Sequence, residues 1–536
     1  MPRHTLPIRA AVLSFAFAVA AVAATPPPTC HVVQIVLPAT APHAVSGRLL
    51  LFAIPLPKAN PPAAIDVDEF EPDAVTVAAQ EIPRLTPGET TTIDTDRIAF
   101  PAGFSKLKPG SYLVQAVLDT HHDYAYGGRT EGDLVSDVTR FTVNAGAADI
   151  PPIALRQTIP AANPWVQPAR VPAAIRQAVA ASRPDAIPIQ FQSACLTKFW
   201  GRPIVLRAWV LPPPGYDAKA ATTYPTVYYT HGFGGSHAGL LRPLAYVDGA
   251  MRANKLPPMI WVFLDQSSPT GTSEFADSVN NGPWGDALTQ ELIPNLEAHY
   301  RMDGTPGGRF LTGHSSGGWA TLWLQVTYPS FFGGTWSTSP DPTDFHDFTN
   351  VDLYAPHANM YHLADGAPVP LVRMHGKAVG FIEPVAKLEA VLGRNGGQFS
   401  SFDWVFSPRG PDGSPIPMFN RVTGDVDPDV VAYWQAHYDI AHLIAAHWRT
   451  LQPDLDGKIH VIVGGADTFY LDGPAHRLQS VLDGLHARSE FRFIPGRGHF
   501  DLYEKGKDMF GLMKDMVWEM YAQARPNSPL REPAGP

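Results

Sequence analysis

Cysteine is nearly absent from this chain of 536 residues, which contains only Cys30 and Cys195. A scaffold held by several disulfides is therefore excluded, because such scaffolds need a high density of cysteine. In an oxidising compartment the two residues could form one disulfide that joins the start of the mature chain to its second domain. We expect this Cys30–Cys195 disulfide, with two unpaired buried thiols as the alternative.

Apolar runs long enough to cross a bilayer are also missing. The longest, from Ala10 to Ala24, spans about 15 residues, whereas a membrane helix needs about 20. Arg3 and Arg9 give this run a basic start, and Val22-Ala23-Ala24 offers small residues for cleavage. We therefore predict that residues 1–24 are a signal peptide and that the protein is exported, either to the periplasm or to the extracellular space.

Basic residues are fewer than acidic ones. The chain has 40 Lys and Arg and 50 Asp and Glu, which gives a net charge of −10. Loss of the predicted signal peptide, with Arg3 and Arg9 and no acids, makes the charge −12. This disfavours nucleic acids and anionic membranes as partners, because both require a positive patch. The motifs Gly-Lys-Ser/Thr and His-Glu-x-x-His are absent as well, so we expect no nucleotide, metal or other cofactor.

Proline is abundant, with 55 residues, and the chain is long enough for two or three domains. Short alternating segments predict a small all-β, sandwich-like domain over residues 25–148. A Pro-rich linker with one short Ala-rich helix from Ala173 to Ala181 is expected over residues 149–185. Strands then alternate with helices over residues 186–525, which predicts an α/β domain with a mostly parallel sheet flanked by helices. We expect a disordered tail over residues 526–536.

One segment of the α/β domain does not follow the alternation of strands and helices. Residues from about 340 to 428 are rich in Pro, Gly and aromatic residues and predict an insertion over one edge of the sheet. Its aromatic side chains could wall a pocket for an aryl or sugar ester, but we expect most of them to form the small core of the insertion itself. They are Phe402, Trp404, Phe406 and Phe419.

A short motif with a central serine lies in the α/β domain. Residues 313–317 read Gly-His-Ser-Ser-Gly and directly follow the apolar segment from Arg309 to Thr312. A strand that ends in a small-residue turn around a serine is typical of a hydrolase nucleophile. Gly313 and Gly317 must be small, because the strained turn presses the backbone against the following helix. The motif predicts Ser315 as a nucleophile, with a buried serine in a Gly-rich packing turn as the alternative.

A serine nucleophile needs a base, and the base needs an acid that fixes its tautomer. In hydrolases with this motif, the acid and then the histidine follow the serine in the chain. Asp467 follows the predicted strand from Lys458 to Val463, and His499 follows the predicted strand from Phe491 to Pro495. Because α/β sheets build their sites at such strand ends, we predict Asp467 as the acid and His499 as the base, with Asp472 as a competitor for the acid.

The reaction also needs hydrogen-bond donors for an oxyanion. We expect one from the backbone N–H of Ser316 and the other from the loop His231-Gly232-Phe233-Gly234-Gly235, with Phe233 preferred over Gly234. A phosphate-binding loop is the rival interpretation, but Gly-Lys-Ser/Thr is absent. A metal site at His231 and His237 is not expected either, because the chemistry does not require a metal.

Taken together, these segments resemble the putative esterase family of α/β-hydrolases. That family includes S-formylglutathione hydrolases, enterochelin esterases, feruloyl esterase domains and mycolyl transferases of the antigen 85 type. The resemblance covers roughly residues 185–525, while the β domain and the 340–428 segment lie outside the core that compact members share. The motifs that carry it are His231 to Gly235, Gly282-Pro283-Trp284-Gly285-Asp286, Glu291-Leu292-Ile293-Pro294, Gly313 to Gly318, Asp467 to Leu471 and Gly496 to Phe500.

The resemblance implies the α/β-hydrolase fold and the same triad of Ser315, Asp467 and His499. The substrate-contacting residues that we expect are His231, Gly234, Trp284 and His314. The expected function is a secreted or periplasmic serine esterase that forms an acyl-enzyme on a small-molecule or carbohydrate ester. An acyltransferase that delivers the acyl group to a sugar or another alcohol is one alternative. A non-catalytic carbohydrate- or surface-binding protein with an inert hydrolase fold is the other.

Overall fold

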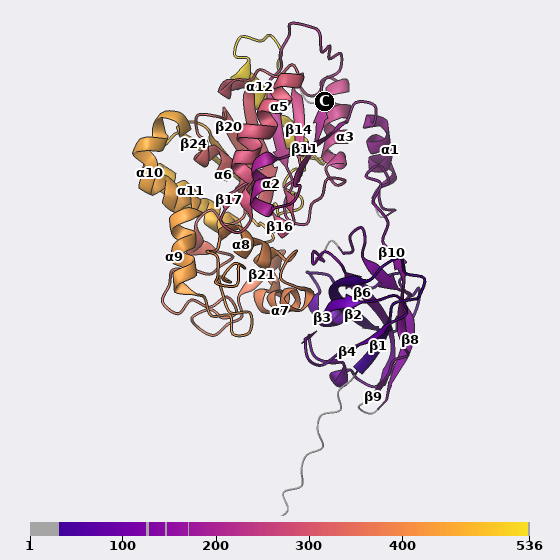
Figure 1. Cartoon of the computed structure of the whole chain (residues 1–536). Coiled ribbons are helices and arrows are strands. Elements are labelled where there is room, and N and C mark those ends of the chain that lie inside the picture. The colour runs from indigo at the N-terminus through magenta and orange to yellow at the C-terminus, as the bar shows by residue number, and fades with distance from the viewer. Residues whose placement is uncertain (1–31, 125–127, 145–146, 170, 534–536) are drawn as a thin grey trace, which may run out of the picture.

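The computed structural model describes residues 32–533, apart from residues 125–127, 145–146 and 170. The predicted signal peptide and Cys30 lie outside the described residues, as does the end of the predicted tail. Figure 1 shows a β-rich N-terminal part beside a larger α/β part. None of the helices in the described residues is both long enough and apolar enough to cross a lipid bilayer.

The strands of the N-terminal part form one connected sheet. Neighbours pair in the order β4-β1-β10-β7-β6-β2-β3-β5, with β8 attached to β6 and β9 to β8. The pairs are antiparallel except for β1 with β10. The strands are β1 (Val32–Val36), β2 (Val45–Pro55), β3 (Thr76–Leu85), β4 (Thr90–Asp94), β5 (Ala99–Phe100), β6 (Gly110–Asp119), β7 (Leu134–Ser136), β8 (Thr139–Asn144), β9 (Ala147–Asp149) and β10 (Ile153–Thr158).

Both faces of this sheet are apolar, because successive strand residues point to opposite sides. On β2, Leu49 and Leu51 pack in one cluster with residues of β1, β4 and β10, so the sheet folds over on itself. Leu50 and Phe52 point the other way and pack with Leu388 of the α/β part. The N-terminal sheet is therefore packed against the rest of the protein.

The N-terminal sheet extends beyond the predicted boundary at residue 148. Strand β10 pairs with β1 and β7, so the start of the predicted linker belongs to the sheet. Further along this segment, α1 (Ala173–Ser182) is the Ala-rich helix that the sequence indicated.

The α/β part contains an eight-stranded sheet in the order β11-β12-β14-β13-β19-β20-β23-β24. Strand β12 is antiparallel to both of its neighbours, and the other pairs are parallel. This is the α/β-hydrolase arrangement that the sequence predicted. The strands are β11 (Ile187–Gln192), β12 (Val205–Leu211), β13 (Thr226–Thr230), β14 (Ile260–Leu264), β19 (Arg309–His314), β20 (Gly334–Thr338), β23 (Ile459–Gly464) and β24 (Ser489–Ile494).

Helices cover both faces of this sheet. On the central strand β13, Val227 packs with α1, α3 (Leu241–Arg252) and α12 (Gly511–Ala524), whereas Tyr228 packs with α5 (Ile293–His299) and α6 (Ser316–Thr327). The buried runs of these strands are the expected consequence of a parallel sheet covered on both sides. The remaining elements include α2 (Ala194–Trp200), α4 (Trp284–Asp286), a π-helix (Ala287–Leu292), α11 (Asp472–Gly484) and the short strands β15 (Ser267–Ser268), β16 (Gly271–Thr272), β17 (Asp277–Ser278) and β18 (Gly282–Pro283).

The predicted insertion carries its own elements, and Figure 1 shows α7 beside β3 of the N-terminal part. It contains the hairpin β21 (Pro370–Met374) and β22 (Lys377–Phe381), followed by α7 (Ile382–Leu392) and α8 (Gln398–Phe406). Phe406 and Phe419 are buried in an apolar core, as expected for most of these aromatics. Phe402 joins the same core and also lines a cavity.

The sequence pattern from Val430 to Thr450 predicts one helix, and this prediction is wrong. Two helices are present instead, α9 (Pro428–His437) and α10 (Ile440–Leu455). The helix is interrupted at Asp439. The carboxylate of this residue accepts hydrogen bonds from the backbone N–H groups of His442 at 2.9 Å and Phe345 at 3.0 Å. A capping aspartate at this position stabilises the start of α10 and ends the preceding helix.

Candidate active site

Ser315 lies at the turn between β19 and α6, where the parallel strand ends and the helix begins. Its backbone has φ 60° and ψ −126°, a conformation that residues with a side chain rarely adopt. A Cβ at Gly313 would lie 2.3 Å from the carbonyl oxygen of Gly317, and one at Gly317 would lie 2.6 Å from the oxygens of Thr230 and His231. The two glycines therefore let the strained turn pack against the neighbouring backbone.

Asp467 and His499 form a buried hydrogen-bonded pair. Each follows a strand, β23 and β24 respectively, and these strands are parallel neighbours, so their following loops lie side by side. Oδ2 of Asp467 is 2.9 Å from Nδ1 of His499, and the two side chains are 0% and 3% exposed. Oδ1 of Asp467 accepts the backbone N–H of Phe469 at 2.9 Å. Burial acts to raise the pKa of Asp467, but His499 and these hydrogen bonds together hold that pKa below its ordinary value.

Asp472, the competitor for the acid, has a different partner. Its carboxylate pairs with the guanidinium of Arg373 at 2.5 Å, and the Nε of Arg373 also donates to the backbone oxygen of Asp467 at 2.7 Å. Arg373 lies on β21 of the insertion and thus holds the loop that carries Asp467. Sequence reasoning missed this residue, because no local motif connects β21 to a loop so much later in the chain.

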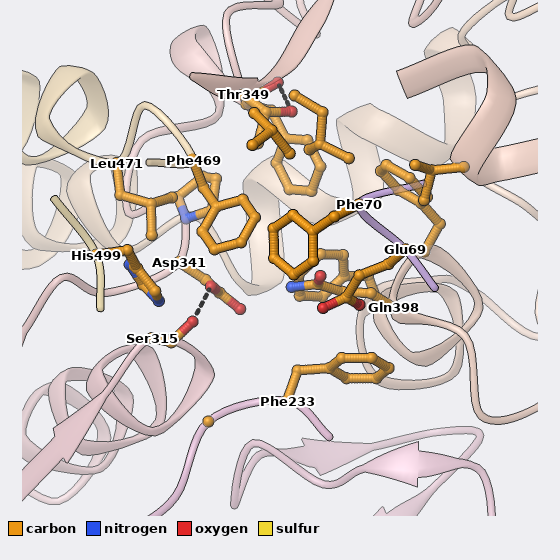
Figure 2. A pocket seen from close by; sticks show the side chains of 18 of the residues that line it. Glu69, Phe70, Phe233, Ser315, Asp341, Thr349, Gln398, Phe469, Leu471 and His499 are labelled. Carbon is orange, nitrogen blue, oxygen red and sulfur yellow. Dashed lines mark hydrogen bonds between the residues drawn. The ribbon is translucent and has the colours of Figure 1, made fainter. Parts of the chain in front are cut away.

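A second carboxylate, Asp341, contacts the serine turn. The Ser315 hydroxyl donates to its Oδ1 at 3.4 Å, and the Ser316 hydroxyl donates to its Oδ2 at 2.6 Å (Figure 2). Burial raises the pKa of Asp341 to about 6, although the Ser316 hydroxyl acts in the opposite direction. Burial and the neighbouring Asp341 also raise the pKa of Glu274 well above its ordinary value. Sequence reasoning missed Asp341, which follows β20 and falls at the start of the segment predicted to be an insertion.

His314 stands beside the proposed base. Its Nδ1 lies 3.1 Å from the Thr338 hydroxyl, and its ring centroid is 4.3 Å from that of His499. Desolvation, and to a lesser degree the charge of His499, lowers the pKa of His314 to about 3. The ring is therefore neutral near neutral pH and adds no positive charge next to His499.

The glycine loop after β13 reaches the same place. Gly232, Phe233 and Gly235 line the cavity beside Ser315, whereas Gly234 is absent from its described lining. His231 is buried beneath the loop, where its ring contacts the Asp265 carboxylate at 3.0 Å and the Gly232 carbonyl at 2.8 Å. This side chain fixes the loop from below instead of facing the cavity.

Trp284 is not brought to the cavity. Its side chain is 2% exposed and packs in the core beneath the sheet, where its indole N–H donates to the Asn281 carbonyl at 2.8 Å. The structure thus places Trp284 away from the expected substrate contacts. Cys195 has no disulfide partner among the described residues, and Cys30, its predicted partner, lies outside them.

The cavity next to Ser315 has a volume of about 260 Å³. Figure 2 shows Ser315 and His499 on one side, with Glu69, Phe70 and Gln398 across from them and Phe233 below. Its walls are mostly aromatic and aliphatic, as is usual for a small-molecule site. Ser315 and His499 thus face a space that can hold a small organic group.

Carboxylates with spacing suited to a metal ion occur elsewhere, in the N-terminal part. Oxygens of Asp119, Asp123 and Asp133 lie within 4.8 Å of one another. They already accept hydrogen bonds, including those from the backbone N–H of Thr130 to Asp133 at 2.8 Å and from its hydroxyl to Asp123 at 2.9 Å. None of these three carboxylates belongs to the described lining of the cavity.

Solved structures to which this chain is similar include those named as a ferulic acid esterase and as S-formylglutathione hydrolases. A ferulic acid esterase from Anaeromyces mucronatus in complex with ferulic acid is 14% identical, with 59% of this chain and 84% of that chain covered and a TM-score of 0.32. An S-formylglutathione hydrolase from Agrobacterium tumefaciens is 15% identical, with 63% and 94% covered and a TM-score of 0.37. An S-formylglutathione hydrolase from Staphylococcus aureus is 11% identical, with 62% and 98% covered and a TM-score of 0.37.

A search of curated proteins finds no match. The family model described as Putative esterase, in contrast, matches residues 206–499, which is more than half of the chain. The matched segment includes the glycine loop after β13, the serine turn, Asp467 and His499. The chain therefore belongs to the Putative esterase family and has its α/β-hydrolase fold.

Proposed function

We propose that this protein is a serine carboxylester hydrolase that works through an acyl-enzyme on Ser315. The observation that carries the proposal is the buried 2.9 Å bond between Asp467 and His499, next to a serine on a strained turn that faces a small-molecule cavity. Such a bond fixes the imidazole tautomer so that Nε2 is free to accept a proton.

In the first half of the proposed reaction, the Ser315 hydroxyl turns from Asp341 to His499. His499 takes the hydroxyl proton while Ser315 Oγ attacks the ester carbonyl carbon. The tetrahedral oxyanion accepts hydrogen bonds from the backbone N–H groups of Ser316 and Phe233. The N-terminal end of α6 adds its positive dipole at the same position.

In the second half, His499 gives its proton to the departing alcohol oxygen, and the acyl group stays on Ser315. A water molecule then attacks this ester while His499 again takes a proton. Collapse of the second tetrahedral intermediate returns the proton to Ser315 and releases the carboxylic acid. Asp467 stabilises the imidazolium form of His499 in both halves.

The proposal includes export of the protein, which rests on the basic and apolar start of the chain. Expression of the full chain in a host with a secretion system tests this part. We expect the mature protein in the periplasm or medium, with its N-terminus at Thr25. Full-length protein that stays in the cytoplasm would contradict it.

The Ser315→Ala variant tests the mechanism. We expect kcat for p-nitrophenyl butyrate to fall by about 10⁴-fold or more, because the nucleophile is lost while the fold stays intact. Circular dichroism and the melting temperature check the fold. A fluorophosphonate probe should label the wild-type protein and not the variant. Substantial turnover by correctly folded Ser315→Ala protein would refute the assignment.

A further inference from the structure

The wall of the cavity opposite Ser315 is supplied partly by the N-terminal part of the protein. Glu69 and Phe70 lie in the loop between β2 and β3, just before a short 3₁₀ helix from Pro72 to Ala74. The Phe70 ring lies 6.1 Å from that of Phe469, measured between centroids, and 6.0 Å from that of Phe500. Figure 2 shows Phe70 next to Phe469 at the cavity, with the Glu69 carboxylate directed inward beside Gln398.

The N-terminal sheet, which carries this loop, packs against the insertion through buried apolar side chains. Leu388 and Leu392 of α7 share an apolar cluster with Leu50 and Phe52 of β2. The guanidinium of Arg48 adds hydrogen bonds to the Val391 carbonyl, from Nε at 3.0 Å and from Nη2 at 2.7 Å. Such an interface fixes the sheet relative to the cavity, so Glu69 and Phe70 are a built part of the site.

Apart from His314 and His499, the ionisable side chains in the described lining of the cavity are all carboxyl groups. Three carboxyl groups line it, and neither lysine nor arginine occurs in its described lining. Two of the three are engaged: Asp341 accepts from Ser315 and Ser316, and Glu389 accepts from backbone N–H groups at the start of α8, including that of Gln398 at 2.7 Å. In the part of the chain that the structure describes, Glu69 forms neither a hydrogen bond nor an ion pair.

Phenylalanine rings form much of the remaining wall. They come from both parts of the protein and include Phe70, Phe233, Phe348, Phe402 and Phe469. The faces of aromatic rings attract cations, and an aromatic site that also contains a carboxylate suits quaternary or protonated amines. An anionic substrate, in contrast, would meet carboxylates with no compensating positive side chain.

We propose that the substrate ester carries a cationic ammonium group and that Glu69 is the residue that selects it. This inference rests on the proposed ester hydrolysis and names its substrate class. Burial, with Asp68 beside it, raises the pKa of Glu69 to about 6, so the carboxylate is ionised at pH 7.5 and available to a cation. The cation belongs to the acyl or to the alcohol half of the ester, and the experiment separates the two.

Two pairs of esters that differ only in charge provide the test. In the acyl pair, the p-nitrophenyl ester of 4-(trimethylammonio)butanoate is compared with that of 5,5-dimethylhexanoate, where carbon replaces nitrogen. In the alcohol pair, choline butyrate is compared with 3,3-dimethylbutyl butyrate, with acid release followed in a pH-stat at pH 7.5. We expect kcat/KM to favour the cationic ester by about tenfold in one of the pairs.

The Glu69→Gln variant should bring that ratio close to one, and any effect common to both esters cancels in the ratio. Glu71→Gln is the matched control, because Glu71 is exposed, belongs to the same loop and is absent from the cavity lining. A ratio near one for the wild-type protein in both pairs, or a preference that survives Glu69→Gln, would overturn the inference.

Binding to the Ser315→Ala protein separates this inference from the proposed function. Calorimetric titration with each ester needs no turnover, and we expect about tenfold tighter binding of one cationic ester, lost in the Ser315→Ala/Glu69→Gln double variant. If the wild-type protein hydrolyses none of the esters but this difference is found, only the hydrolysis fails. If neutral esters are hydrolysed and no difference in binding is found, only the assignment of the cation fails.

Discussion

The two sides of the cavity are built in different ways. Ser315, Asp467 and His499 follow strands of one sheet, so the hydrogen bonds of that sheet set their relative positions. Glu69 and Phe70 on the opposite side come from a separate sheet, whose position depends on side-chain packing against α7. We call the side with Ser315, Asp467 and His499 the proposed reacting side, and the side with Glu69 and Phe70 the opposite side. Because the two are held in place differently, we expect changes on the reacting side to affect the chemical step and changes on the opposite side to affect which substrate is bound.

The largest effect on the reacting side should come from Asp467→Asn. The amide cannot stabilise the imidazolium form of His499, so we expect kcat to fall by about 10³- to 10⁴-fold. Steady-state kinetics with p-nitrophenyl butyrate measure this loss. Asp472→Asn is the matched control, because Asp472 contacts Arg373 and not His499. We expect a loss of less than about tenfold for the control, and a larger loss for Asp472→Asn than for Asp467→Asn would transfer the acid role to Asp472.

The serine turn itself should tolerate no added atom. In Gly317→Ala, the new Cβ would lie 2.6 Å from two backbone oxygens, and we expect the free energy of unfolding to fall by about 3 kcal/mol. Gly484→Ala is the control, since Gly484 also lies in a helix but is exposed, with nothing within 4 Å of the added Cβ. Urea denaturation should show an unchanged or slightly more stable control. Equal stability of the two variants would mean that the turn is less tightly packed than described.

Much of the reacting side could be predicted from the sequence, because each residue follows an apolar strand segment and strand ends meet at one edge of a parallel sheet. The apolar segment from Thr226 to Thr230, for example, predicts a buried strand before the glycine loop, and β13 has the same bounds. Asp341 obeys the same rule after β20, but it falls at the start of a segment that was interpreted only as an insertion. Trp284, which we also expected to contact the substrate, packs in an apolar core and is absent from the described lining of the cavity.

The opposite side could not be predicted in this way. Glu69 and Phe70 are far from Ser315 in the chain, and their place depends on how β2 packs against α7. Neither the hydrophobic periodicity of a segment nor a short motif predicts a contact between two regions so far apart in the sequence. The break at Asp439 was missed for a related reason, because the apolar pattern continues across it while the capping carboxylate ends one helix and starts the next.

The Asp341→Asn variant tests whether the pKa of Asp341 is raised in the folded protein, through the pH dependence of stability. A carboxyl group whose pKa is raised in the folded chain stabilises the fold at low pH, and this contribution is lost as the pH rises through the folded pKa. Burial raises the pKa of Asp341 from 3.8 to about 6, so the free energy of unfolding of the wild-type protein should fall by about 2.5 kcal/mol between pH 4 and pH 8, a loss that the variant does not show.

Denaturant unfolding of both proteins at several pH values measures this difference. At pH 4 the Asp341 carboxyl group is largely protonated in the folded protein, so the remaining gap there reports only the exchange of hydroxyl for amide. Parallel stability profiles for the two proteins across this range would contradict a raised pKa for Asp341.

The smallest effect is expected on the opposite side, from Phe70→Ala. Phe70 is 40% exposed and contacts Phe469 and Phe500 at the cavity, so its loss removes apolar contact with the substrate but leaves the triad in place. We expect KM for p-nitrophenyl butyrate to rise by about fivefold to tenfold while kcat changes by less than about twofold. Phe199→Ala is the control, because Phe199 is 38% exposed and absent from the described lining of the cavity. A fall in kcat with KM unchanged would mean that the N-terminal part positions the reacting groups, and the contrast between the two sides would then be lost.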